Sequence, residues 1–191
     1  MTTRIGLLLF PRLTQLDLTG PYEVFARLPE AQVLLVGSGE ARSDTGLRLQ
    51  PDVGHADAPQ LDVICVPGGP GVNDAMEGYR ATTHWLSLDL LTPFGATPVR
   101  ERVVIDRNRA TGGGVTAGID FGLRLAAELR GEKVAQAIQL LMEYDPAPPF
   151  RAGSPRSADP TLVESVSAAR RGLNDERRRI VERAAAKLAS G

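Results

Sequence analysis

The sequence predicts an α/β protein with a doubly wound, mostly parallel sheet of the flavodoxin-like kind. Short apolar segments alternate with amphipathic ones along the chain, the pattern of strands connected by helices. The first apolar segment, residues 5–10, has apolar residues on both faces, as expected for a strand covered by helices on both sides. In open parallel sheets ligands bind beyond the carboxyl ends of the strands, so a site is expected where such segments end.

The first half of the chain supplies three predicted strands and one helix. Pro11 ends the strand at residues 5–10, and residues 33–36 form the second strand. Between them, Gly20 and Pro21 are expected to open a helix, because proline is tolerated in a first turn. The third strand, residues 61–66, ends in Pro-Gly-Gly, where glycine lets backbone N–H groups approach a ligand.

The second half predicts helices and a hairpin. A helix runs from Trp85 to Leu91, and residues 102–105 and 111–114 form two strands around a polar turn. Thr116 is expected to cap the next helix, and a second helical segment follows it. After a proline-rich linker at residues 146–155, a long amphipathic helix starts at Thr161. Its predicted inner face is Leu162, Val166, Leu173, Ile180, Val181, Ala184 and Leu188.

Composition favours one domain, residues 1–191, that handles a small-molecule ligand or substrate. A chain of 191 residues can bury roughly 70% of its unfolded surface in one core. The formal charge of -1 gives no reason to bind nucleic acid or an anionic membrane, and the arginines at 177–179 alternate with acidic neighbours, as on a solvated face. With no signal peptide, no membrane span and one cysteine, a cytoplasmic location is expected.

Several site motifs are missing or weak, and neither a cofactor nor a metal is predicted. The sequence contains no P-loop, no Gly-x-Ser-x-Gly elbow and no clustered His or Cys with metal-ligand spacing. Residues 112–117, GGGVTA, match a dinucleotide fingerprint formally. The strand before them is short and no βαβ unit surrounds them, so we do not favour a nucleotide site.

Five motifs in order carry a family resemblance: QLDLTGP at 15–21, DVICVPGG at 62–69, ATTHW at 81–85, ERVV at 101–104 and TGGGVTAGIDF at 111–121. Together they resemble the DJ-1/PfpI superfamily, and within it the isocyanide (isonitrile) hydratases. The resemblance implies a flavodoxin-like fold, a homodimer, and a nucleophilic cysteine on a strained turn between a strand and a helix. It also implies hydration of isocyanides to N-substituted formamides through that cysteine, without a cofactor.

The segment that carries this cysteine is absent from the chain. The glycine-rich turn continues directly into the ATTHW motif, so a strand, the elbow and a helix are missing between Glu77 and Gly78. Such a passage needs ~30 residues or more. Removing a central strand leaves its neighbours with unpaired backbone groups. The flanking strands could pair directly, a dimer partner could fill the space, or the printed sequence could omit residues of the natural protein.

The chain's one cysteine, Cys65, does not replace the missing nucleophile. It aligns with a position inside a strand of the family, two residues before Pro67. A cysteine in an apolar strand is commonly a buried hydrophobic residue, and burial suppresses the reactive thiolate. We therefore interpret Cys65 as structural, unless a rearranged sheet exposes it.

The remaining candidate site residues are Asp17, His84, Gly68, Gly69 and Gly71. The resemblance implies that Asp17 contacts the nucleophile and transfers protons; otherwise it is a carboxylate placed favourably before a helix N-terminus. His84 is either a pocket residue or a histidine packed beside its neighbouring tryptophan. The three glycines could offer backbone N–H groups to a bound ligand, as in an oxyanion hole, and also form a tight turn.

Two hypotheses for the function follow. The first is an isocyanide hydratase-like enzyme, which needs the missing elbow. The second is a catalytically silent DJ-1/PfpI-fold module for dimerisation or for binding a small regulatory ligand, which needs only the scaffold. For the chain as written, no turnover of a simple isocyanide is predicted.

Overall fold

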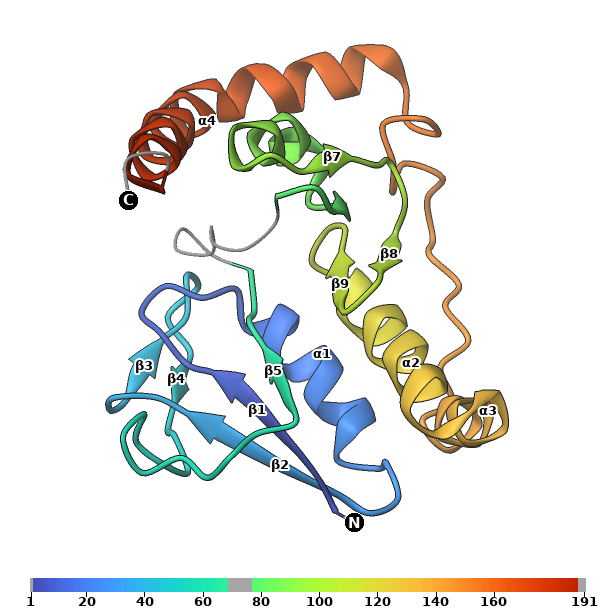
Figure 1. Ribbon diagram of the computed structural model, residues 1–191. Helices are drawn as coiled ribbons and strands as arrows, with labels where there is room; N and C mark the ends of the chain where they lie inside the picture. The colour runs from blue at the N-terminus through green and yellow to red at the C-terminus, as the bar shows by residue number, and fades with distance from the viewer. Residues whose placement is uncertain (1, 69–76, 189–191) are drawn as a thin grey trace. The chain divides into compact units, whose positions relative to one another are not determined.

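The structure is a computed structural model that describes residues 2–68 and 77–188 (Figure 1). The chain divides into two compact units. The first unit comprises residues 1–72 and 114–143, and the second comprises residues 73–113 and 144–191. Each unit is described by itself below. The prediction of one domain over residues 1–191 remains a prediction.

A three-stranded parallel sheet forms the centre of the first unit. Its strands are β1 (Thr3–Leu8), β2 (Ala31–Val36) and β5 (Val63–Cys65), in the order β2-β1-β5. In register, Leu7 of β1 lies between Leu35 of β2 and Cys65 of β5. The parallel sheet predicted from the apolar segments is therefore confirmed. A short antiparallel pair, β3 (Ala41–Arg42) and β4 (Arg48–Leu49), lies between β2 and β5 in the sequence.

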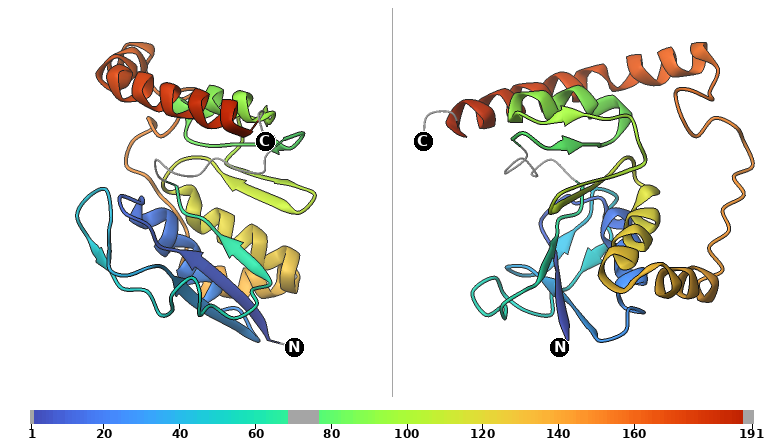
Figure 2. Two further views of the ribbon diagram at one scale, coloured as in Figure 1. Left: turned by 60° about the vertical axis from the view of Figure 1, so that its left-hand side comes forward. Right: turned by 45° about the vertical axis from the view of Figure 1, so that its right-hand side comes forward.

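Three helices complete the first unit: α1 (Gln15–Phe25), α2 (Ala117–Arg130) and α3 (Glu132–Leu141). Helix α1 packs against the sheet and against α2, and α3 packs on α2 (Figure 2). Two glycines permit the close approach of α1 and α2. A Cβ on Gly20 would lie 3.2 Å from the Gly118 carbonyl carbon, and a Cβ on Gly118 would lie 3.0 Å from Pro21 Cδ.

The predicted start of the first helix is wrong. Helix α1 begins at Gln15, so Pro21 lies inside it and is fully buried. A proline in a helix interior loses one backbone hydrogen bond, but here its ring fills the contact with α2. Thr116 occupies the N-cap position of α2, as predicted, although its side chain makes no capping hydrogen bond.

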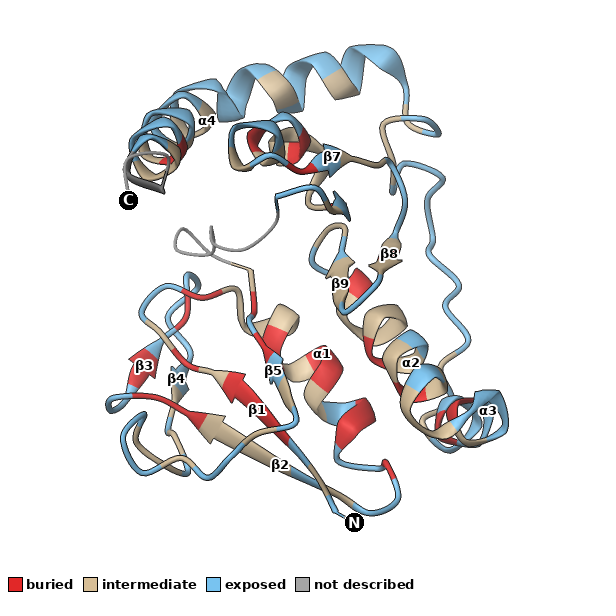
Figure 3. Ribbon diagram, in the orientation of Figure 1, coloured by how far each residue is buried: buried red, intermediate tan, exposed pale blue. Residues whose placement is uncertain are grey.

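The core of the first unit lies between the sheet and α1 (Figure 3). Its largest fully buried side chains come from β1, from α1 and from the loop between them: Ile5, Leu7, Leu13, Leu18, Val24 and Phe25. Helix α2 is attached at its far end by Arg130, whose guanidinium donates to Thr3 Oγ1 over 2.7 Å. The first strand and the second helical layer are thus joined by both apolar packing and a side-chain hydrogen bond.

The second unit combines short strands, a 3-10 helix and a long α-helix. Strand β6 (Arg80–Ala81) pairs in parallel with β7 (Thr97–Pro98), and η1 (Trp85–Phe94) connects them. Strands β8 (Val103–Asp106) and β9 (Arg109–Gly112) form the predicted antiparallel hairpin, and α4 (Pro160–Leu188) packs along η1. Within the described residues, no helix is both long and apolar enough to cross a membrane.

The predicted inner face of α4 is right only in part. Val181 is buried, but Leu162 and Val166 are 46% and 39% exposed, and the side chain of Leu188 lies outside the described residues. The middle of α4 is held on η1, where Arg178 Nη2 lies 2.5 Å from Asp89 Oδ2. The first turns of α4 lack such a partner along their apolar face.

Strand β5 keeps one edge without a partner in the described part of the chain, since it pairs only with β1. Strand β6 belongs to the second unit, where it pairs with β7, and the options for closing a gap between Glu77 and Gly78 remain predictions. The face of β5 that carries Ile64 and Val66 is also open, with these side chains 61% and 41% exposed. Fully covered parallel strands bury both faces, whereas this strand is covered on one face only in the described residues.

Because Ile64 faces solvent, Ile64→Thr should change the free energy of unfolding by less than about 0.5 kcal/mol. Leu7→Ala in neighbouring β1 is the matched control, and it should cost about 2–5 kcal/mol because Leu7 is fully buried. Urea denaturation followed by circular dichroism measures both. A cost of several kcal/mol for Ile64→Thr would mean that another segment or chain covers this face in solution.

Candidate functional site

The candidate site of the first unit lies where β5 ends beside the start of α1. Both backbone groups of Gly68 are used there: its carbonyl accepts the Thr14 N–H over 2.9 Å, and its N–H donates to the Asp17 carboxylate. A Cβ on Gly68 would collide with Asp17 Oδ2, so no other residue fits without a shift of the carboxylate. The end of the strand and the first turn of the helix are therefore locked together.

Asp17 is held in a setting that favours its protonated form. Burial raises the pKa of its carboxyl group to about 6; the Gly68 N–H partly opposes this rise, and the nearby Asp44 carboxylate adds to it. The carboxyl group lies in the first turn of α1 and not before the helix, which corrects its predicted location. A group with a pKa near 6 can both donate and accept a proton close to neutral pH.

Cys65 lies next to this corner and is buried. Its side chain is only 6% exposed in β5. Burial, followed by the negative charge of Asp17, raises the pKa of the Cys65 thiol to about 12. The interpretation of Cys65 as a buried strand residue is confirmed, and at neutral pH it is a thiol.

Of the three predicted backbone donors, the structure describes Gly68 alone, while Gly69 and Gly71 lie outside the described residues. The N–H of Gly68 is directed at Asp17. A ligand oxygen at this position would have to share the Gly68 N–H with the Asp17 carboxylate or displace that carboxylate from it. The role of these glycines as an oxyanion hole remains a prediction.

His84 belongs to the second unit, whereas Asp17 belongs to the first. Its Nδ1 accepts the Leu86 N–H over 3.3 Å and so caps η1, and its ring lies 5.9 Å from that of Trp85. Burial lowers the pKa of His84, and the positive charges of Arg177 and Arg170 lower it further. The imidazole is therefore neutral at pH 7, as suits a packed capping residue; a catalytic role stays untested.

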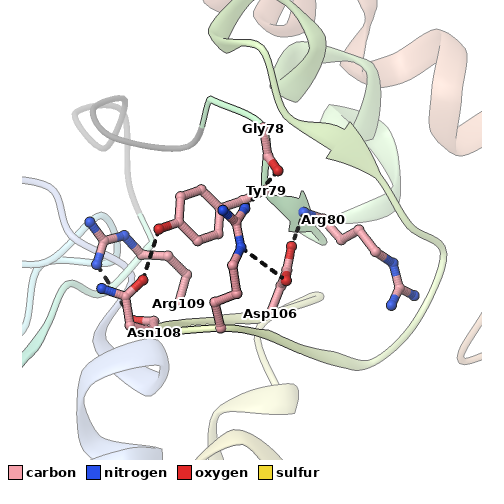
Figure 4. Close-up of polar contacts among 7 residues, drawn as sticks. Gly78, Tyr79, Arg80, Asp106, Asn108 and Arg109 are labelled. Carbon is pink, nitrogen blue, oxygen red and sulfur yellow. Dashed lines mark hydrogen bonds and ion pairs between the residues drawn. The ribbon is translucent and has the colours of Figure 1, made fainter.

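A polar cluster that no sequence motif indicated surrounds Tyr79, two residues after Glu77. The ring of Tyr79 lies under two cations: the Arg107 guanidinium is 3.6 Å and that of Arg109 is 5.4 Å from its centroid (Figure 4). The Tyr79 hydroxyl donates to Asn108 Oδ1 over 2.8 Å. Cation–π contacts of this kind add a modest stabilisation at exposed sites.

The same cluster fixes the backbone around Gly78. Arg107 Nη2 donates to the Gly78 carbonyl over 2.6 Å, and the Arg80 N–H donates to Asp106 Oδ2 over 2.7 Å. The Gly78 N–H in turn donates to the Gly95 carbonyl over 2.9 Å. The turn between β8 and β9 thus holds the junction residues in place. The sequence signal was only a polar turn at 106–109, whose partner could not be read from it.

Within residues 2–68 and 77–188, no three His, Cys, Asp or Glu side chains gather closely enough to hold a metal ion. The candidate site combines one carboxyl group with a raised pKa, one constrained glycine and a buried thiol. Together with the β2-β1-β5 parallel order, this defines a flavodoxin-like α/β protein with an acid at the carboxyl end of a strand.

Comparison with known proteins shows which members of this fold class the chain is similar to. The chain is 46% identical to isonitrile hydratase of Pseudomonas putida over 225 residues, which covers 98% of this chain and 99% of that protein. A THiJ/PfpI family protein from Pseudomonas syringae matches with a TM-score of 0.89 at 33% identity, covering 95% of this chain and 91% of that one. Drosophila melanogaster DJ-1beta matches in fold alone, with a TM-score of 0.60 at 16% identity over 75% of this chain and 98% of its own.

No family model matches the sequence. The chain nevertheless belongs to the DJ-1/PfpI superfamily, and isonitrile hydratase is its homologue over nearly the full length. The alignment runs over 225 positions although this chain has 191 residues. At least 34 aligned positions of the relative (225 minus 191) therefore have no counterpart here.

Asp17→Asn should stabilise the protein at pH 8 but not at pH 4. The raised pKa means that the folded state binds the Asp17 proton more tightly than the unfolded chain, so this contribution to stability is present below about pH 3.8 and lost as pH rises through about 6. Asparagine cannot ionise and avoids the loss, which is about 1 kcal/mol for a part-exposed carboxyl group. Urea denaturation at both pH values measures the difference.

Glu128→Gln, at an exposed position on α2, is the matched control for the loss of one carboxylate. An equal effect of Asp17→Asn at pH 4 and pH 8 would contradict a raised pKa for Asp17.

Cys65 should react with Ellman's reagent about 10³-fold more slowly in the native protein than in the urea-unfolded chain at pH 7. The factor follows from the rise of the thiol pKa from 9.0 to about 12, because only the thiolate reacts. The absorbance of the released thiolate gives both rates. A native rate within about tenfold of the unfolded rate would show that Cys65 is accessible and reactive.

Proposed function

We propose that this chain is an isocyanide hydratase-like protein that binds a small molecule beside Asp17 without converting it through a covalent cysteine intermediate. The observation that carries the proposal is the pairing of a retained acid with an inert thiol. Asp17 has a pKa near 6, whereas the chain's one cysteine is buried with a pKa near 12. In the described residues the Asp17 corner is in place, and the cysteine beside it is buried.

Two further observations support a missing elbow segment between Glu77 and Gly78. The relative has at least 34 aligned positions that this chain lacks, close to the ~30 residues that a strand, elbow and helix need. In addition, β5 has a free edge in the described residues and an open face at Ile64 and Val66. A neighbouring strand and its covering helix would bury both.

The competing function is hydration of an isocyanide, R–N≡C plus water giving R–NH–CHO. The 46% identity with isonitrile hydratase favours it by descent. Covalent catalysis requires a thiolate to attack the isocyanide carbon, followed by protonation and hydrolysis of the thioimidate. In this chain Cys65 would have to leave the core of the first unit to do so. We also propose, from the family relation, that the protein is a cytoplasmic homodimer.

Incubation with cyclohexyl isocyanide should give no N-cyclohexylformamide above the rate without protein, and no adduct in the intact mass. The reason is that Cys65 is not available as a thiolate. Mass spectrometry of small molecules and of protein measures both products. Binding without turnover is followed by the shift of the Asp17 carboxyl resonance in ¹³C NMR, and Asp17→Asn identifies that resonance by removing it.

Formamide production that Cys65→Ser abolishes would overturn this proposal in favour of the hydratase. The assay also requires proof that Glu77 is followed directly by Gly78 in the protein tested. Trypsin releases residues 49–80 as one peptide that spans Glu77 and Gly78, because the segment contains no internal Lys or Arg. If protein from the natural gene does not yield this peptide and instead yields peptides with additional sequence after Glu77, the elbow segment exists, which would likewise favour the hydratase.

A further inference from the structure

The first turns of α4 carry apolar side chains that the sequence pattern predicts to be buried and that the structure leaves exposed. Leu162 and Val166 lie one turn apart on the same side of the helix and are 46% and 39% exposed. Residues four apart in a helix share a face, so the two form one apolar strip. Both belong to the second unit.

A hollow of about 150 Å³ lies beside this strip, entirely within the second unit. Its walls come from the start of η1, from the segment before α4 and from the first turns of α4: Trp85, Ala152, Gly153, Ser154, Pro155, Ala158, Leu162, Val163 and Val166. A cavity of this volume holds one benzene ring. The hollow thus matches a single six-membered ring in size.

Hydrogen bonds hold the wall before α4 in place. The Ser154 carbonyl accepts the N–H groups of Ser157 and Ala158 over 3.0 and 2.9 Å, and Ser154 Oγ accepts the Arg156 N–H over 3.2 Å. Asp159 then starts α4 by accepting the Thr161 N–H over 2.8 Å. A binding site whose walls are already ordered loses less entropy when a ligand binds.

The chemistry of the walls selects against charge. None of the nine lining residues is ionisable, and the polar side-chain groups among them are the Ser154 hydroxyl and the Trp85 indole N–H. The neighbouring His84 is neutral at pH 7, so it adds no charge beside Trp85. A charged molecule would lose hydration here, and no lining residue offers it an ionic partner; Arg170 and Arg177, which act on His84, are not among the lining residues.

We propose that this hollow is a binding site for an uncharged aryl or cycloalkyl ring with at most one hydrogen-bonding group. The ring covers Leu162 and Val166 and contacts Trp85. The site is separate from the Asp17 corner of the first unit, so it goes beyond the function proposed above and stands or falls independently of it.

The probe for this proposal is 4-fluorobenzyl alcohol. It should bind with a Kd on the order of 1 mM, as small fragments do, and both its ¹⁹F linewidth and the protein's tryptophan emission should change saturably. Trp85 is the chain's one tryptophan, so its fluorescence reports on this hollow. The charged analogue 4-fluorobenzoate should bind at least about tenfold more weakly. Equal affinity for both probes, or no saturable change with the alcohol, would overturn the proposal.

Two substitutions at one part-exposed position locate the binding. Val166→Phe fills the hollow and Val166→Glu places a charge at it, and each should weaken binding by about tenfold or more. Leu140→Glu, at an 82% exposed position of α3 in the first unit, is the matched control and should leave binding unchanged. Thermal melting verifies that each variant folds. Binding of the probe that survives in both Val166 variants would overturn the proposal. The proposal would also be overturned if the unmodified protein did not bind the probe and Val166→Glu abolished self-association, because the strip would then be an interface between copies of this chain.

Discussion

The hydrogen-bonded attachment of Gly68 to the start of α1 is the constraint on which the first unit's site depends. The carbonyl of Gly68 accepts from Thr14, its N–H donates to Asp17, and the missing side chain leaves room for the carboxylate. This geometry draws the carboxyl group into partial burial, which raises its pKa. The pKa of Cys65 is raised mainly by its own burial in β5, and the charge of ionised Asp17 adds to that rise. The turn after β5 therefore sets the surroundings of Asp17 directly and affects Cys65 only as a second contribution.

Much of this arrangement could be predicted because it is encoded locally. Continuous apolar runs, two of which end at proline, predicted the strands of the central sheet, and the Pro-Gly-Gly turn indicated the corner. The exact start of α1 could not be read from the sequence, because proline at position 21 normally marks a first turn. Its place inside the helix depends on Gly118 from α2, which is about a hundred residues away in the sequence and makes room for the ring.

Contacts between distant segments account for the other differences. The Arg107 guanidinium stacks on the Tyr79 ring, although the two residues are 28 positions apart in the sequence. Neither segment has a sequence pattern that predicts this contact. The apolar strip of α4 is a similar case. Helical periodicity indicates which side chains share a face, but it does not reveal whether a partner covers that face along its whole length. Val181 has such cover, and Leu162 does not.

The edge of β5 that does not pair with β1 leaves backbone groups without a strand partner in the described residues. The Asp62 N–H donates to the Arg4 carbonyl, so by the alternation of parallel ladders the backbone groups of Val63 and Cys65 point away from β1. Unpaired groups cost about 1–3 kcal/mol each when buried, but little when water can reach them. Ile64 is 61% exposed and Cys65 is 6% exposed, so water reaches one face of this strand and not the other. In the described residues, the first unit thus keeps the Asp17 carboxyl group and the Gly68 turn beside a strand that is covered on one face only.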